Sequence, residues 1–150
     1  MKEAIRLSLE KVTEGKAGPF GAVVVKEGRI VGTGWNQVVA AGDPTAHAEI
    51  VAIREACRAL NDHQLAGCEI YASCEPCPMC LGAIYWARLD RLWYAATRHD
   101  AAAAGFDDAF IYEELGRAPD RRRLRAVQIL RADALNALDA WRANPDKTPY

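Results

Sequence analysis

The sequence has no long uncharged apolar run, and this excludes proteins that cross a membrane as a helix. No stretch approaches the roughly 18 apolar residues that such a helix needs. Residues 1–6 include Lys2, Glu3 and Arg6, where a secretory signal needs apolar side chains. We therefore expect a soluble protein in the cytoplasm.

Excess charge is also missing, because the formal net charge is only -1. Such a chain has no general attraction for the phosphate backbone of nucleic acids. Residues 117–131 are the local exception, with six arginines against one acid, Asp120. This run has two interpretations, a solvated loop and strand edge or a binding patch.

Cysteines are few and odd in number, five in 150 residues. Three of them, Cys74, Cys77 and Cys80, lie close together, which favours a reducing compartment and metal binding over a disulfide framework. Cys57 and Cys68 are expected in the core. At this length the chain predicts a single domain over residues 1–150, able to bury a core without disulfides.

Hydrophobic periodicity predicts an α/β fold, a three-layer α/β/α sandwich with a five-stranded mixed sheet. Asp43 and Pro44 are a helix N-cap followed by proline at the first helical position, so a helix is expected to open there. The predicted helices cover residues 3–14, 44–60, 77–88, 107–115 and 132–143. The predicted strands cover residues 20–25, 30–35, 68–73, 91–96 and 124–130, of which the first two form a hairpin.

A split set of metal ligands is the strongest functional signal: His47 and Glu49 are followed about thirty positions later by Cys77 and Cys80. The two cysteines are three residues apart on a helix, so they share a face, and the helix N-terminus favours their thiolates. His47 completes a set of three ligands, the number typical of catalytic zinc. The offset between His47 and Glu49 requires the ion to lie off the helix end.

Glu49 is the acid that can move protons beside such an ion. Its chemistry suits hydrolytic deamination of an amidine-like carbon, which yields a carbonyl and ammonia. A structural site with Cys74 as the fourth ligand remains an alternative, as does a chance Cys-x-x-Cys without metal.

His-x-Glu combined with Pro-Cys-x-x-Cys is the signature of zinc-dependent deaminases of nucleobases. Together with residues 19–25, 43–49 and 73–80 and with Asn36, it resembles the purine-deaminating branch of the cytidine deaminase-like superfamily. That branch comprises tRNA adenosine deaminases and bacterial guanine deaminases, and the resemblance covers residues 19–112. Within it, residues 105–112 and Tyr150 are similar to the bacterial guanine deaminases.

The resemblance implies the cytidine deaminase-like fold and one Zn²⁺ per chain on His47, Cys77 and Cys80, with Glu49 as the proton shuttle. It implies conversion of guanine to xanthine and ammonia by a cytoplasmic homodimer, with no membrane or nucleic-acid partner. The implied substrate contacts are Phe20 as an aromatic wall, Asn36, Ala48, Trp86, Asp108 as a second catalytic acid, and Tyr150. Tyr150 belongs to the C-terminal helix and tail, about residues 133–150, as a lid over an active site, its own or the partner subunit's.

Asp108 has a physical argument of its own, because guanine offers a ring N–H and an exocyclic amine to a carboxylate, whereas adenine lacks the ring donor. Ordinary roles remain open for these residues: core packing for Phe20 and Trp86, a turn for Asn36, a helix cap for Asp108 and a frayed terminus for Tyr150.

The leading alternative function is a tRNA adenosine deaminase that converts adenosine to inosine at the wobble position, which needs a positive groove for the anticodon stem. The arginines of residues 117–131 keep it open. Deamination of cytosine or a pyrimidine nucleoside and a noncatalytic zinc-stabilised interaction module are two further alternatives.

Overall fold

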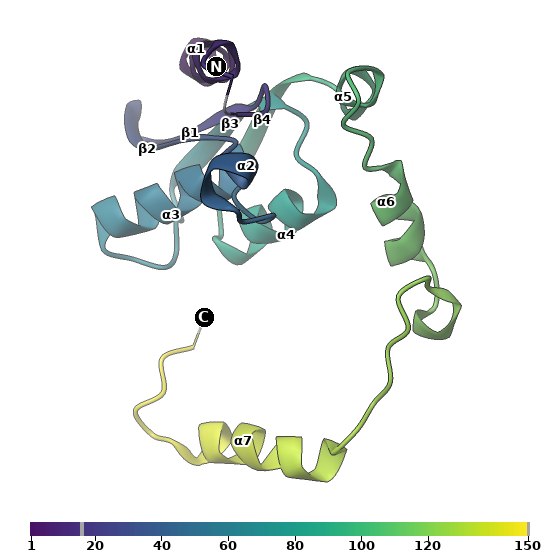
Figure 1. The fold of residues 1–150 in the computed structure, drawn as a ribbon. Helices are drawn as coiled ribbons and strands as arrows, with labels where there is room; N and C mark the ends of the chain where they lie inside the picture. The colour runs from purple at the N-terminus through teal and green to yellow at the C-terminus, as the bar shows by residue number, and fades with distance from the viewer. Residues whose placement is uncertain (16, 150) are drawn as a thin grey trace. The chain divides into compact units, whose positions relative to one another are not determined.

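The computed structural model describes residues 1–15 and 17–149, which fall into two compact units, Met1–Ala109 and Phe110–Tyr150 (Figure 1). The elements of the first unit are α1 (Lys2–Thr13), β1 (Gly21–Lys26), β2 (Arg29–Trp35), α2 (Val38–Ala41), α3 (Ala48–Leu60), β3 (Cys68–Cys74), α4 (Pro78–Trp86), β4 (Arg91–Ala96) and α5 (Arg98–Ala103). After them come α6 (Ala109–Gly116), the 3-10 helix η1 (Pro119–Arg121) and α7 (Arg131–Ala143).

One mixed sheet organises the first unit, with strand order β2-β1-β3-β4. β1 pairs antiparallel with both β2 and β3, while β3 and β4 run parallel. The parallel pair brings the ends of β3 and β4 together, with Cys74 opposite Ala96. The two loops that leave these strand ends are therefore neighbours.

Helices cover both faces of this sheet, so the first unit has the predicted three layers (Figure 1). A Cβ at Gly21 would collide with the carbonyl oxygen of Ala4 in α1, and one at Gly34 with that of Ala48 in α3. Glycine is the residue that permits such close approach of backbone to backbone. Gly34 therefore lets the first turn of α3 lie directly on β2.

The core lies between the sheet and the pair α3 and α4. Its fully buried side chains include Val24, Ile70, Leu65 and Cys68, and Ile84 of α4 joins the same cluster. Burying side chains of this size contributes roughly 1.5–3 kcal/mol each. This packing fixes the start of α3 against the start of α4.

The predicted fifth strand, residues 124–130, is wrong: among the described residues the sheet has four strands. Leu124, Val127 and Ile129 are 81%, 79% and 74% exposed. Strand-forming residues make a strand only where a neighbouring strand supplies ladder hydrogen bonds. This segment has no such neighbour within the described part of the chain.

The start of the second predicted helix also differs, because α3 begins at Ala48 and not at Pro44. Asp43 Oδ1 instead accepts the N–H and the hydroxyl of Thr45, at 2.8 and 2.7 Å, which closes a local turn. Helices α2 and α5 fall where no helix was predicted.

The other predicted elements are confirmed to within a few residues. None of the helices in the described residues is long and apolar enough to cross a membrane.

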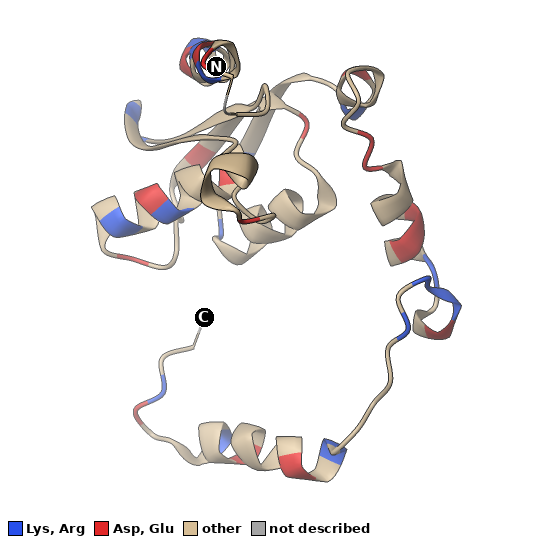
Figure 2. Ribbon diagram, in the orientation of Figure 1, with Lys and Arg blue, Asp and Glu red and all other residues tan. Residues whose placement is uncertain are grey.

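In the second unit, acidic and basic residues alternate in sequence around α6 and η1 (Figure 2). Arg117 pairs with Glu114 at 2.6 Å, and Arg123 lies 3.9 Å from the same carboxylate. Arg121 lies 3.9 Å from Asp120. Part of the positive charge of the arginine run is therefore neutralised locally.

Candidate metal centre and its pocket

His47 stands at the N-cap of α3, with extended backbone at φ -69° and ψ 156°. Its carbonyl oxygen accepts the N–H of Val51 at 3.0 Å, while its own N–H donates to the carbonyl oxygen of Thr45 at 2.8 Å. The imidazole consequently lies off the end of the helix, as the spacing to Glu49 required.

Cys77 occupies the equivalent position at α4, as its N-cap residue, and Pro78 starts the helix. Cys80 lies in the first turn and is fully buried, whereas Cys77 is half-buried. The N-termini of α3 and α4 therefore direct the side chains of His47 and Cys77 toward the same point.

The three ligand atoms have the spacing that a tetrahedral zinc ion requires. His47 Nδ1 lies 3.6 Å from Cys77 Sγ and 3.5 Å from Cys80 Sγ, and all three atoms lie within 4.8 Å of one another. Bond lengths of about 2.3 Å to sulfur and about 2.0 Å to nitrogen, at a tetrahedral angle, give an N···S edge of about 3.5 Å. The observed distances fit a single ion.

Each ionisable group of the ligand set shifts the pKa of its neighbours. A hydrogen bond from Cys80 lowers the pKa of Cys77, and the Cys77 thiolate in turn raises the pKa of Cys80. The hydrogen bond with Cys77 raises the pKa of His47. A centre of negative sulfur beside an imidazole is a binding site for a borderline-soft cation, whose uptake displaces these protons.

Glu49 projects from the first turn of α3 to the same ligand set. Its side chain is buried, and its Oε2 lies 3.5 Å from Cys80 Sγ. Burial raises the pKa of Glu49, and the charge on Cys77 adds to this. A raised pKa brings a carboxyl group closer to the range in which it can both accept and return a proton.

Cys74 does not join the ligand set, which among the described residues consists of His47, Cys77 and Cys80. Its Sγ donates to the carbonyl oxygen of Thr97 at 3.4 Å instead. Three protein ligands are the number typical of catalytic zinc, whereas structural sites carry four. The structural Cys3His alternative therefore has no support in this geometry.

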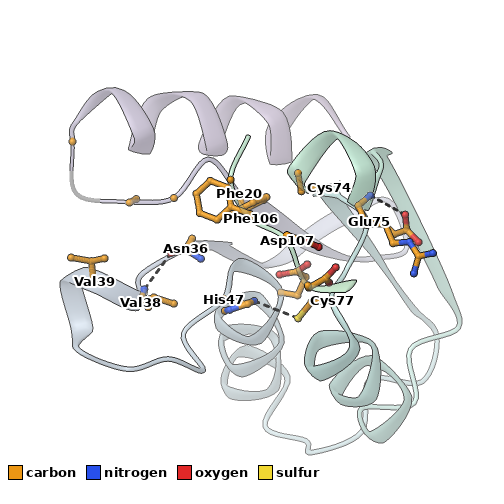
Figure 3. A pocket seen from close by; sticks show the side chains of 18 residues that line it. Phe20, Asn36, Val38, Val39, His47, Cys74, Glu75, Cys77, Phe106 and Asp107 are labelled. Atoms are coloured by element: carbon orange, nitrogen blue, oxygen red, sulfur yellow. Dashed lines mark hydrogen bonds between the residues drawn. The ribbon is translucent and has the colours of Figure 1, made fainter. Parts of the chain in front are cut away.

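A cavity of about 580 Å³ opens above the ligands (Figure 3). Six of the predicted site residues line it: Phe20, Asn36, His47, Glu49, Cys77 and Asp108. Burial raises the pKa of Asp108, and the charge on Cys77 acts in the same direction. Asp107, not Asp108, accepts the N–H of Ala109 at 2.9 Å where α6 begins.

The remaining predicted contacts lie elsewhere. Ala48 is buried at the start of α3, and Trp86 is 65% exposed at the end of α4; neither is among the lining residues. Tyr150 lies outside the described residues.

The pocket also contains residues that sequence reasoning did not assign to it. Phe106 meets Phe20 edge to face, with ring centroids 4.9 Å apart at 85° (Figure 3). Glu75, Arg98 and the exposed Val39 line it as well. The signal for Phe106 was its place directly before the two aspartates, since a substrate pocket needs apolar walls around its polar groups.

Comparison with known proteins places this geometry in a family. The model of the cytidine and deoxycytidylate deaminase zinc-binding region matches residues 1–96. The chain belongs to this deaminase family. It is therefore a zinc-binding enzyme of hydrolytic deamination, with His47, Cys77 and Cys80 as its possible metal site.

Individual relatives differ in how much of the chain they match. Guanine deaminase of Bacillus subtilis (strain 168) is 50% identical over 150 residues, which is 100% of this chain and 96% of the relative. Its crystal structure superposes with a TM-score of 0.96 at 50% identity and covers 99% of this chain and 95% of its own.

Two further relatives match smaller shares. The tRNA-specific adenosine deaminase of Aquifex aeolicus (strain VF5) is 44% identical over 96 residues, 64% of this chain and 63% of that one. A variant of NE0047, crystallised with 8-azaguanine, is 34% identical, has a TM-score of 0.68 and covers 80% of this chain and 65% of its own.

Removing one thiolate tests whether these three residues bind the metal. We expect the Cys80→Ser variant to fall from about one zinc ion per chain to a small fraction of one after dialysis, because a hydroxyl is a far poorer ligand than a thiolate. Zinc is measured by mass spectrometry on purified protein.

Cys57→Ala is the matched control, because Cys57 is a half-buried free thiol of α3 outside the ligand set. It should keep its zinc. A Cys80→Ser protein that retains a full equivalent would remove Cys80 from the centre.

Proposed function

We propose that this protein converts guanine to xanthine and ammonia by hydrolytic deamination. One observation carries the proposal: Asp108, a half-buried carboxylate, lines the same cavity as His47, Cys77 and Glu49. The B. subtilis guanine deaminase supports it, since its match at 50% identity extends over the whole chain, beyond the zinc-binding region to the segment that holds Asp108 and to the residues C-terminal to it.

The metal part of the site is formed by His47, Cys77 and Cys80. Zinc, when bound there, supplies the Lewis acidity that makes water a nucleophile near neutral pH. Glu49 would take one proton from the attacking water and deliver it to the purine ring, and then take the second proton of the same oxygen and deliver it to the departing amine, so that ammonia leaves and a carbonyl remains. Its burial beside Cys80 places the carboxylate where it can serve both steps.

Substrate binding is the task of the other walls. Phe20 and Phe106 supply apolar surface for the flat purine, and Asn36, nine-tenths buried, supplies an amide for hydrogen bonds. Asp108 accepts the ring N–H and the amine of guanine, of which adenine lacks the ring donor. Ala48 and Trp86 stay proposed contacts.

Deamination of adenosine in tRNA is the second candidate, and the A. aeolicus relative is the reason to consider it, at 44% identity. That match covers only 64% of this chain. The net charge of -1 and the local pairing of Arg117, Arg121 and Arg123 with acids speak against a strong phosphate-binding surface.

A substrate panel tests the proposal. Zinc-loaded protein is given guanine, adenine, cytosine, guanosine and an anticodon-stem RNA with adenosine at the wobble position, and ammonia release is measured for each. We expect turnover on guanine, and at least ~100-fold slower turnover on adenine, because a site that hydrogen-bonds a donor rejects analogues that lack it.

Asp108→Asn is the informative variant for the same panel. The amide keeps the shape but loses the charge, so guanine turnover should fall by more than adenine turnover. Activity on the RNA alone, with a steep decline as salt rises, would overturn the proposal in favour of the tRNA editing function.

We further propose that the two units of each chain belong to one deaminase domain, and that the protein is a cytoplasmic homodimer. Exposed aromatic side chains support the homodimer: α4 carries no charged residue (Figure 2), and Tyr85, Trp86 and Tyr94 of α4 and β4 are 69%, 65% and 48% exposed. Aromatic surface of this kind marks protein interfaces. Tyr150 is proposed to close a pocket as part of the C-terminal tail.

Mixed dimers test which pocket the tail closes. Chains with Glu49→Gln are mixed with chains that lack Tyr150, and guanine turnover is compared with that of each parent. If the tail closes the partner's pocket, the mixture regains activity, because one pocket then has both Glu49 and Tyr150. Mixtures as inactive as their parents would mean that each tail serves its own pocket, and sedimentation of a monomer would reject the dimer.

A further inference from the structure

The pocket joins two chain segments that are separate in sequence. Cys77 and Cys80 follow β3, while Asp108 comes some thirty residues later, after β4 and α5. If the ligand set and Asp108 act on one small molecule, their separation must be held to within a fraction of an ångström. The proposed function of the site therefore depends on whatever ties these segments together.

Three hydrogen bonds connect the two segments. The N–H of Glu75 donates to the carbonyl oxygen of Ala96 at 2.8 Å, and Cys74 Sγ donates to the carbonyl oxygen of Thr97 at 3.4 Å. The third uses a side chain, because Glu75 Oε2 accepts the N–H of Arg98 at 3.0 Å (Figure 3). The first two connect the loop to the end of β4, and the third reaches the first residue of α5.

Arg98 is the first residue of α5, and its N–H has no acceptor within the helix. The neighbouring donor is satisfied locally, since Thr97 and Asp100 form a capping box at 2.8 and 3.3 Å. α5 then ends at Ala103, and Gly105, at φ 92°, turns the chain so that Phe106, Asp107 and Asp108 line the pocket.

We propose that Glu75 is a positioning residue for the deaminase site, a proposal that rests on the function assigned above. Its carboxylate holds the start of α5 two residues from the zinc ligand Cys77, and so fixes Asp108 relative to the metal centre. Glu75 acts on the substrate by positioning, chiefly that of Asp108.

Backbone amide chemical shifts test, without any ligand, whether Glu75 holds α5 and Asp108 in place. In Glu75→Ala, the backbone shifts should change along α5 as far as Asp108, and the amide of Arg98 should exchange with solvent faster than in the wild type. Changes confined to Arg98 would overturn the proposal, because the bond would then be a local cap.

Binding of 8-azaguanine to the zinc-loaded protein tests the consequence. Glu75→Ala should weaken binding ~10-fold, the effect of losing one charge-assisted hydrogen bond. Its zinc content should stay at one per chain. In an Asp108→Asn background the same change should have little effect, because the positioned group has already been removed.

Two conservative variants separate positioning from a direct contact. Glu75→Gln keeps an oxygen acceptor at the same reach and should bind nearly as well as the wild type, whereas Glu75→Asp keeps the charge but is shorter and should bind worse. A carboxylate that touches the ligand predicts the reverse order. Loss of zinc in Glu75→Ala, or additive effects with Asp108→Asn, would also contradict the proposal.

Glu55→Ala is the matched control. Glu55 Oε2 likewise accepts a backbone N–H, that of Thr33 at 2.5 Å, but outside the pocket lining. It should leave 8-azaguanine binding unchanged. If the wild type neither binds 8-azaguanine nor deaminates guanine, the proposed function fails, and the amide shifts still decide the role of Glu75.

Discussion

Convergence of two helix N-termini on one point is the constraint on which the site depends. The start of α3 delivers His47 Nδ1 and the start of α4 delivers the sulfurs of Cys77 and Cys80, 3.6 and 3.5 Å from that nitrogen. A shift of either helix by one ångström would spoil a tetrahedral site. Placement of the two helices against the sheet therefore matters more to function than any single side chain in the pocket.

The fold secures that placement by close contact. Gly34 allows the first turn of α3 to touch β2, and the buried Ile84 ties α4 to the same core as Ile70 of β3. The position of Glu49 follows from the same packing, because side chains of a helix lean toward its N-terminus, and the ligands lie off that end of α3. Burial then raises the pKa of Glu49 toward the range in which a carboxyl group can both accept and return a proton.

Much of this could be predicted from the sequence, because local patterns determine it. Short apolar runs separated by turn residues located β1, β2, β3 and β4, and the spacing of His47, Cys77 and Cys80 identified the metal ligands. The resemblance to purine deaminases added Phe20, Asn36 and Asp108, all of which line the cavity.

The rest depends on contacts that sequence spacing does not show. Residues 124–130 have strand-forming composition but no neighbouring strand, and Asp43 closes a turn with Thr45 where a helix cap was expected. Phe106 joins the pocket after α5, a helix too short to leave a periodic pattern, and Glu75 joins it from the loop after β3. Trp86 has a helical aromatic pattern, yet its side chain lies at the surface.

A zinc titration tests the central claim most directly, that a metal centre on His47, Cys77 and Cys80 works with Glu49 to deaminate guanine. Metal-free protein is titrated with zinc while ammonia release from guanine is followed, for the wild type and for Glu49→Gln. Activity of the wild type should rise to a plateau at about one equivalent, while Glu49→Gln binds the same zinc and turns over ~10²–10⁴-fold more slowly. Equal turnover by both proteins, or turnover without zinc, would contradict the account.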